Sequence, residues 1–383
     1  MHYIKRVLED KLEDYLKRFT VVGITGPRQS GKSTLIKHLL KNEYRYFSFD
    51  KGSNRELFYG DPVRFMQTYD NKVIFDEVQK VPELFEYIKD AVDNDRRNNG
   101  KYVITGSAQF HLIKNITESL AGRIGLLTLL PFQFSEMPKK NRAESMFKGS
   151  YPEPVLFNYE NNEDWYASYI DTYLERDVRD VAQIGDLRDF KRFIGLLAAN
   201  TSQILSLSRF ANDLGVAVST INRWISVLEA SYIIFLLPPY YKNYGKRIVK
   251  SPKIYFYDTG IVSYFTGIRN QELFENGPMK GAIFENYIIA EIVKKERHIK
   301  SHADFYYYRT SKGNEVDLII DRKTQHEFIE IKCNATFNPK MIKQVDELLS
   351  KNDKGILLYQ GESMSYGKDI KIENYQDYLL KTE

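Results

Sequence analysis

The first 130 residues contain short apolar runs that are separated by polar turns. Residues 21–24, 73–75, 102–104 and 124–130 are apolar over lengths typical of buried strands. Residues 35–40 have the pattern of a helix. Because strands that alternate with helices favour a parallel sheet covered by helices, we expect an α/β fold for the first part of the chain.

The middle of the chain has the pattern of a winged helix. Residues 205–214 and 219–228 predict two helices, with Gly215 ending the first and Ser219 capping the second. Two strand-like runs then follow, at residues 232–237 and 253–257. These runs would form the wing.

Polar and basic residues of this unit suit a nucleic acid. The second predicted helix offers Ser219, Thr220, Asn222 and Arg223 to a DNA groove. The connection between the predicted wing strands interleaves tyrosines with basic residues, namely Tyr240, Tyr241, Tyr244, Lys242, Lys246, Arg247, Lys250 and Lys253. Because Trp224, Ile225 and Leu228 have a core-like pattern, the unit also fits a structural lid or a dimerisation module.

The C-terminal third has a helical run followed by three strand-like runs. Residues 281–291 have helical periodicity, and residues 306–309, 315–320 and 328–332 are strand-like. A turn at residues 321–325 separates the last two strands. We therefore expect these two strands to pair as a hairpin in a second α/β domain.

The length of the chain bounds its organisation. With 383 residues it exceeds the size at which one core keeps growing, so we expect domains at residues 1–150, 151–265 and 266–383. Charged residues make up 28% and hydrophobic residues 43%, which is an ordinary globular balance. A net charge of +4 argues only weakly for nucleic acid, although local basic clusters remain compatible with it.

The sequence contains no pattern for membrane insertion or secretion. No apolar stretch approaches the roughly 18 residues of a membrane span, and residues 1–14 lack the apolar core of a secretory signal. The single cysteine, Cys333, excludes an intramolecular disulfide and agrees with a reducing compartment. We expect a cytoplasmic protein without a membrane partner.

The connection between the first apolar run and the following helix is a complete phosphate-binding loop. Its residues are Gly26, Pro27, Arg28, Gln29, Ser30, Gly31, Lys32, Ser33 and Thr34. The two glycines allow the tight turn in which successive N–H groups surround phosphates, and the next helix offers its positive end. Lys32 would reach the outer phosphates, and Ser33 would hold Mg²⁺ through its hydroxyl. A nucleoside triphosphate with Mg²⁺ is therefore expected.

Polar residues also follow the next two apolar runs. Asp76 is expected to orient Mg²⁺ and its water, and Glu77 to polarise the water that attacks the γ-phosphate. Ser107 would lie beside them, because the carboxyl ends of parallel strands share one edge of the sheet. There Ser107 either senses the γ-phosphate or only caps a helix.

Residues 26–34, 73–79, 104–107 and 118–123 together resemble the AAA+ ATPases of prokaryotes that carry a C-terminal domain of unknown function. The resemblance covers nearly the whole chain and implies a P-loop ATPase core, ATP as the nucleotide and a homo-oligomeric ring, by default a hexamer. It assigns Ser107 to the first sensor position and Arg123 to the region from which an arginine finger reaches a neighbouring subunit. Arg123 is also compatible with a simple response to a helix dipole.

Two segments before the winged helix are less specific. Residues 151–154 predict a turn, and residues 165–180 predict a helix that carries Arg176 and Arg179. This helix is either a lid that points a cation at the nucleotide or an ordinary solvated helix with alternating charges.

The C-terminal third contains a second group of candidate catalytic residues. Pairing of its last two strands would bring together Asp317, Glu330 and Lys332, and Glu285 lies in the preceding helix. Three carboxylates and a lysine suit Mg²⁺-dependent phosphodiester cleavage, because the acids bind the metal and the lysine positions or deprotonates water. The order resembles that of the PD-(D/E)xK nuclease superfamily, which implies a restriction-endonuclease-like fold, with Asp317, Glu330, Lys332 and Glu285 in its motifs. Val316 replaces the proline of that pattern.

Two functions follow from these patterns. In the first, ATP hydrolysis remodels or processes branched or single-stranded DNA, and the C-terminal site nicks it. In the second, the ATPase is a regulatory switch whose C-terminal domain is a silent DNA clamp or a docking module for a protein. The intact acidic set favours the first, and the modest net charge favours the second.

Overall fold

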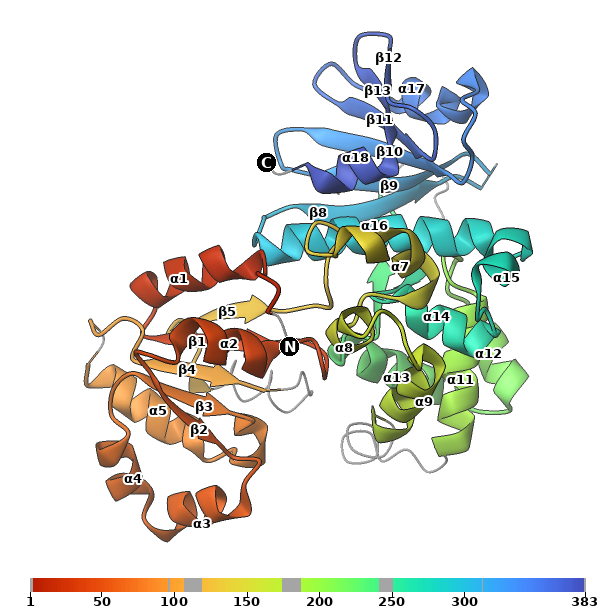
Figure 1. Ribbon diagram of the computed structural model, residues 1–383. Coiled ribbons are helices and arrows are strands. Elements are labelled where there is room, and N and C mark those ends of the chain that lie inside the picture. Colours follow the sequence, from red (N-terminus) through yellow and green to blue (C-terminus); the bar gives the residue numbers. More distant parts are fainter. Residues whose placement is uncertain are drawn as a thin grey trace.

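The computed structural model describes residues 3–95, 97–106, 119–173, 187–240, 251–311 and 313–381. Figure 1 shows an N-terminal sheet domain, a mainly helical middle and a C-terminal sheet, which lies over the long helix α16 (Lys280–His298). Within these residues, no helix is long and apolar enough to cross a membrane.

The N-terminal domain is built on a parallel sheet, as predicted; it has five strands, one more than the four apolar runs indicated. Its strand order is β2-β3-β4-β1-β5. The bounds are β1 (Val21–Thr25), β2 (Arg45–Ser48), β3 (Val73–Asp76), β4 (Tyr102–Thr105) and β5 (Ile124–Thr128). Strands β1, β3 and β4 are buried along their whole length, because helices cover both faces of the sheet.

Each face of this sheet has its own apolar core. Helices α1 (Leu8–Arg18) and α2 (Lys32–Leu40) pack on one face against Val22, Ile74 and Val103. Residues of α3 (Gly52–Gly60), α4 (Pro62–Thr68) and α5 (Leu84–Asp93) pack on the other face. Because all strands are parallel, residues that follow β1, β3 and β4 meet at one edge.

The middle region is a helical assembly with one small hairpin. Its helices are α7 (Arg142–Lys148), α8 (Pro152–Leu156), α9 (Asn162–Tyr173), α11 (Leu187–Ala199), α12 (Leu207–Leu214), α13 (Val218–Ala230), α14 (Thr259–Thr266) and α15 (Gln271–Asn276). Strands β6 (Ile234–Leu237) and β7 (Lys253–Phe256) pair antiparallel. Two consecutive helices and a pair of antiparallel strands are therefore present where the sequence predicted them.

Two local predictions in this region were wrong. Ser219 does not cap α13, because the helix already begins at Val218 and extended Ala217 is its N-cap. Residues 151–154 are not an isolated turn but the start of α8, since Pro152 occupies the first helical turn, where its missing N–H costs nothing. Gly215 ends α12 as predicted, in a left-handed conformation with φ 68°.

The C-terminal domain has a mixed six-stranded sheet in the order β12-β13-β11-β10-β9-β8. The strands are β8 (Asp304–Arg309), β9 (Glu315–Asp321), β10 (His326–Lys332), β11 (Lys354–Tyr359), β12 (Met364–Tyr366) and β13 (Ile370–Asn374), with helices α17 (Lys343–Leu348) and α18 (Tyr375–Leu380). Strands β9 and β10 form the predicted antiparallel hairpin, whereas β10, β11 and β13 run parallel.

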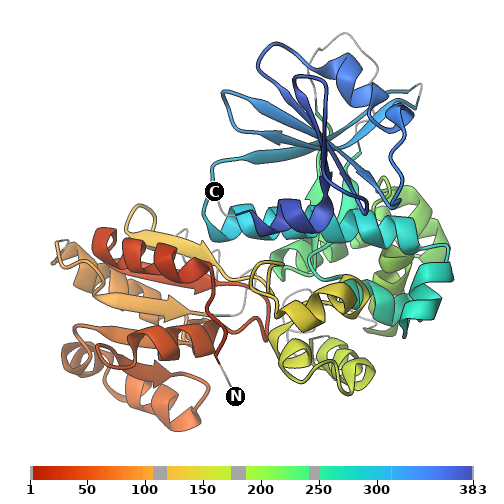
Figure 2. The ribbon, with the colours of Figure 1, turned by 45° about the horizontal axis from the view of Figure 1, so that its top comes forward.

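Helix α16 connects the regions physically. One hydrophobic core runs from Leu130 through α11, α13 and β7 to α16 and the inner face of the C-terminal sheet, ending at Leu379. Figure 2 shows α16 between the C-terminal sheet and the middle helices. A shift of α16 would therefore be felt on both of its sides, because close-packed interiors transmit strain.

Candidate functional site

The phosphate-binding loop between β1 and α2 has the backbone that its glycines require. Gly26 has φ 141°, and Gly31, the N-cap of α2, has φ 97°. A Cβ atom at Gly26 would come within 2.1 Å of the Leu129 carbonyl oxygen. Only glycine fits this turn, which holds the loop against the residue that follows β5.

Lys32 lies over this loop with its side chain buried. Its Nζ donates to the carbonyl oxygens of Gly26 at 3.0 Å and Pro27 at 2.7 Å. Lys32, Ser33, Thr34 and Glu77 line a cavity of about 330 Å³ together with Arg28, Gln29, Gly31, Tyr169 and Thr172. Helix α9 of the middle region thus forms one wall of the candidate nucleotide site.

Asp76 is the centre of a hydrogen-bond network at the carboxyl edge of the sheet. The Ser33 hydroxyl donates to its Oδ2 at 3.0 Å. The hydroxyls of Tyr46 and Thr105 also donate to its carboxylate. A carboxylate and a hydroxyl that lie side by side are the oxygen donors that Mg²⁺ prefers, so this pair fits the predicted metal site. Tyr46 and Thr105 were not identified from the sequence, although Thr105 ends a strand at the expected edge.

Glu77 follows β3 in a left-handed conformation, with φ 58° and ψ 44°. Gln79 donates to its carboxylate. Burial raises the pKa of Glu77, whereas the positive charge of Lys32 and the Gln79 hydrogen bond lower it. The unusual backbone turns this carboxylate into the cavity that Lys32 also lines.

Arg6 supports the loop from outside the motif. Its guanidinium donates to the Ser30 carbonyl oxygen at 2.9 Å and to the Leu130 carbonyl oxygen at 2.7 Å. Its Nε lies 3.1 Å from Oε2 of Glu136, and both side chains are almost fully buried. Glu136 in turn accepts from the N–H groups of Val7 and Gln133.

The segment that Arg6 contacts is also bound by α16. His298 Nε2 accepts from the Leu130 N–H at 3.1 Å, and Glu291 accepts from the Phe134 N–H at 2.6 Å. Lys294 donates to the Phe132 carbonyl oxygen at 2.7 Å and to Glu291 at 2.5 Å. We call Arg6, Glu136, Glu291, Lys294 and His298 the buried junction. It connects the phosphate-binding loop to α16.

The predicted acidic residues of the C-terminal third lie on α16, β9 and β10. Lys332 of β10 pairs with Glu330 and lies 3.8 Å from Oδ2 of Asp317, which also accepts from the Ile331 N–H at 2.9 Å. Burial and the charge of Asp317 raise the pKa of Glu330. These three residues therefore come together as the hairpin prediction required.

Glu285 is separated from this group by a lysine of the middle region. Lys253 Nζ lies 3.0 Å from Oε1 of Glu285, 2.5 Å from Oε1 of Glu315 and 4.0 Å from Oδ1 of Asp317. In the described part of the chain, no three acidic, histidine or cysteine side chains are grouped so that they could hold a metal ion. The predicted metal set of Glu285, Asp317 and Glu330 is therefore not assembled in this conformation.

Comparisons with known proteins divide the chain into three matched parts. Residues 18–138 match the family described as an AAA domain, residues 139–272 a domain of unknown function (DUF8612), and residues 280–376 a domain of unknown function (DUF4143). Uncharacterized proteins of Mycobacterium tuberculosis and Mycobacterium bovis are each 30% identical over 330 residues, which are 85% of this chain and 73% of each relative. The chain belongs to this family of AAA-domain P-loop ATPases.

More distant proteins are also similar to this AAA-domain ATPase. An uncharacterized protein of Methanocaldococcus jannaschii is 24% identical over 364 residues, which are 85% of this chain and 78% of the relative. Among solved structures, the Walker-type ATPase of Pyrococcus abyssi has 15% identity and a TM-score of 0.45, and the match covers 69% of this chain and 96% of that one.

Of the remaining predicted site residues, Arg123 lies within the described part of the chain. Arg123 precedes β5, at the sheet edge opposite the phosphate-binding loop, and its Nε and Nη2 donate to Asp93 at 2.8 and 3.0 Å. Ser107, Arg176 and Arg179 lie outside the described residues.

The residues that were predicted to contact a DNA groove lie on helix α13 of this ATPase. Ser219, Asn222 and Arg223 are exposed on α13, and Thr220 is partly buried, while Trp224, Ile225 and Leu228 are core residues. Of the predicted basic connection, Tyr241, Tyr244, Lys242, Lys246, Arg247 and Lys250 lie outside the described residues, whereas Tyr240 and Lys253 are described.

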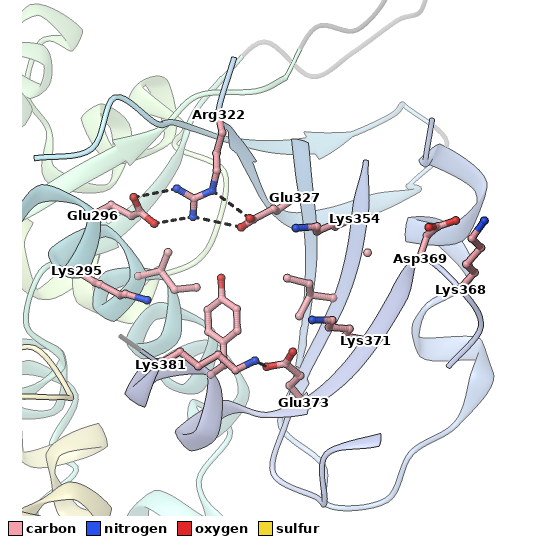
Figure 3. A pocket seen from close by; sticks show the side chains of 14 residues that line it. Lys295, Glu296, Arg322, Glu327, Lys354, Lys368, Asp369, Lys371, Glu373 and Lys381 are labelled. Carbon is pink, nitrogen blue, oxygen red and sulfur yellow. Dashed lines mark hydrogen bonds and ion pairs between the residues drawn. The ribbon is translucent and has the colours of Figure 1, made fainter. Parts of the chain in front are cut away.

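The pocket of Figure 3 lies between α16, α18 and the C-terminal sheet and has a volume of about 260 Å³. Arg322 is bound to Glu296 and Glu327 on its wall, and Lys381 pairs with Glu373. Four more lysines line it and have no ion-pair partner within the part of the chain that the structure describes, namely Lys295, Lys354, Lys368 and Lys371. Its lining is therefore net positive.

Proposed function

We propose that this ATPase binds and hydrolyses MgATP at the phosphate-binding loop and uses the cycle to act on DNA through its middle and C-terminal domains. The observation that carries the proposal is the convergence of Lys32, Ser33, Asp76 and Glu77 at one sheet edge. These groups are those that phosphoryl transfer to water needs.

Each side chain has one task in the proposed hydrolysis. The loop N–H groups and Lys32 bind the phosphates, and Ser33 with Asp76 would hold Mg²⁺, which neutralises charge on the phosphate oxygens when bound. Glu77 orients a water molecule and accepts its proton, a role that suits a carboxylate whose pKa is raised by burial. In a ring, Arg123 would leave Asp93 and reach the nucleotide of the adjacent subunit. Ser107 is proposed as the sensor of the γ-phosphate.

Hydrolysis has a direct route to the rest of the chain. Tyr169 and Thr172 of α9 line the nucleotide cavity, so loss of the γ-phosphate changes what α9 packs against. The proposed division into residues 1–150, 151–265 and 266–383 is supported by the separate parallel and mixed sheets.

Three observations support DNA as the partner. Asp317, Glu330 and Lys332 lie together on a hairpin next to α16, as in the resemblance to PD-(D/E)xK nucleases. The polar face of α13 is exposed. The pocket of Figure 3 presents lysines that suit phosphate contacts. A nuclease activity that needs Mg²⁺ at Glu285, Asp317 and Glu330 is part of this proposal.

One observation favours a second function, in which the C-terminal domain is a silent clamp or docking module. Lys253 lies between Glu285 and Asp317, where a nuclease would bind its metal. In this alternative, ATP hydrolysis only switches the partner that the domain binds.

ATP turnover by purified protein tests the proposal. Lys32→Ala should abolish turnover, and wild-type rates in that variant would refute the assignment. Cleavage of a panel of single-stranded, flapped and branched DNA with Mn²⁺ and ATP should be lost in Asp317→Asn. Absence of cleavage in the wild type across the panel would favour the silent domain.

A further inference from the structure

Lys253 is buried among carboxylates that come from a different part of the fold. It begins β7 in the middle region, and only 2% of its surface is exposed. Its ammonium contacts Glu285 of α16 at 3.0 Å and Glu315 of β9 at 2.5 Å, with Asp317 at 4.0 Å. Three carboxylates therefore surround this one ammonium group.

The position of Lys253 is fixed by its strand. Phe256, three residues later, donates its N–H to Oδ1 of Asn286 and accepts from Nδ2 of the same side chain, both at 2.8 Å. Tyr255 donates its hydroxyl to Oε1 of Glu285 at 2.7 Å. Strand β7 is thus bound to α16 beside the acidic residues.

The surrounding cations nearly neutralise the acidic residues. Lys253 forms ion pairs with Glu285 and Glu315. Arg309 lies 3.1 Å from Glu315, and Lys332 pairs with Glu330. Oε2 of Glu330 is buried without a hydrogen-bond partner among the described residues. A divalent ion needs several carboxylate oxygens at once, and Lys253 already occupies those of Glu285 and Glu315.

We propose that Lys253 is the resident cation of the acidic site, and that its ammonium keeps a divalent ion from binding Glu285 and Asp317 in this conformation. The inference deepens the proposed function and rests on it. It states that Lys253 of the middle domain closes the nuclease-like site. A divalent ion and the Lys253 ammonium exclude each other. The site opens only when β7 is withdrawn from α16.

This arrangement explains why the middle domain lies between the two candidate sites. The same domain supplies α9 to the nucleotide cavity and β7 to the acidic site. A nucleotide-dependent movement of this domain is therefore able to expose the carboxylates. A lysine with a purely structural role would have no effect on metal binding.

Metal binding is tested by titrating nucleotide-free full-length protein with Mn²⁺ in a calorimeter. The wild type should show no site that depends on Asp317. Lys253→Met, which keeps the length of the side chain without its charge, should gain one site at least about tenfold tighter than any wild-type binding. Asp317→Asn in the same background should remove that site.

Two control variants separate metal exclusion from loss of a buried charge. Lys253→Arg keeps the positive charge and should gain no Mn²⁺ site. Lys101→Met removes another buried ammonium, which pairs with Asp70 at 2.9 Å and Asp95 in the N-terminal domain, and should also gain none. Thermal unfolding gives a second readout, since Mn²⁺ should raise the melting temperature of Lys253→Met but not that of Lys101→Met.

A folded Lys253→Met that gains no site would overturn the inference. If Lys253→Met does not fold, the wild type still decides: a wild-type Mn²⁺ site that Asp317→Asn removes overturns the inference, and its absence supports it. ATP turnover and its response to DNA are measured separately in wild-type protein. If the metal prediction fails while ATP turnover still depends on DNA, the proposed function stands. If the metal prediction holds but DNA does not change ATP turnover, only the proposed action on DNA is refuted.

Discussion

Replacement of Arg6 by methionine tests whether the buried junction holds the phosphate-binding loop. Arg6 makes two hydrogen bonds to carbonyl oxygens, of Ser30 and Leu130, and an ion pair with Glu136, and it is 3% exposed. Methionine fills a similar volume without these groups. Glu136 would then be a buried carboxylate without its cation.

The magnitude follows from the burial of both partners. Removal of one partner from a buried ion pair costs about 3–5 kcal/mol, because the other charge is left uncompensated. We expect the free energy of unfolding to fall by this amount in Arg6→Met. Glu136→Gln removes the stranded charge but keeps an acceptor oxygen for only one of the N–H groups of Val7 and Gln133, which bond different carboxylate oxygens. The double variant should therefore lose about 1–3 kcal/mol less than the sum of the single variants.

Urea unfolding followed by circular dichroism measures these free energies. An ATP titration measures the affinity of the phosphate-binding loop for nucleotide. Arg6→Met should also bind ATP more weakly, because the Ser30 carbonyl loses its anchor. Trp165 and Trp224 both lie in the middle region and report its unfolding by fluorescence. A loss of stability below about 1 kcal/mol together with unchanged ATP affinity would refute the assignment of Arg6, because surface substitutions have effects of that size.

Three further predictions concern other parts of the account. Glu77→Gln should keep ATP binding but lower turnover about 10²- to 10⁴-fold in a phosphate-release assay, and wild-type turnover would exclude Glu77 as the base. Burial lowers the pKa of His298 from 6.5 to about 3. The contribution of the neutral His298 ring to the stability of the fold is therefore complete above pH 6.5 and is lost as the pH falls toward 3. Relative to His298→Gln, wild-type stability should fall by about 1.4 kcal/mol per pH unit below 6.5 in urea unfolding, and parallel pH profiles would contradict this. The pair Lys354→Glu and Lys371→Glu should weaken DNA binding and reduce its salt dependence in an anisotropy titration, and unchanged binding would remove the pocket from the DNA surface.

The features of this protein that could be predicted are those determined by residues close together in the sequence. The loop at residues 26–34 was identified because glycine spacing, a preceding strand and a following helix are all adjacent in the sequence. Asp317 and Glu330 were placed together because strand alternation and a short turn determine the hairpin register. Both predictions depend on contacts between near neighbours.

The parts that sequence reasoning missed depend on distant contacts. Arg6 meets the Leu130 carbonyl across 124 residues, and no periodicity reports such a pair. Lys253 was interpreted as part of a basic linker, although its alternation with Tyr255 at the start of a strand puts both side chains on one face. That alternation was the one available indication that Lys253 points toward the protein. Ser219 was assigned as a cap from its residue type, but the backbone had already become helical at Val218.

ATP turnover with and without DNA tests the central claim most directly. We expect single-stranded or branched DNA to raise ATP turnover of the wild type, and Lys32→Ala to show no turnover under either condition. Turnover that no DNA changes would contradict the claim that ATP hydrolysis by this protein serves an action on DNA.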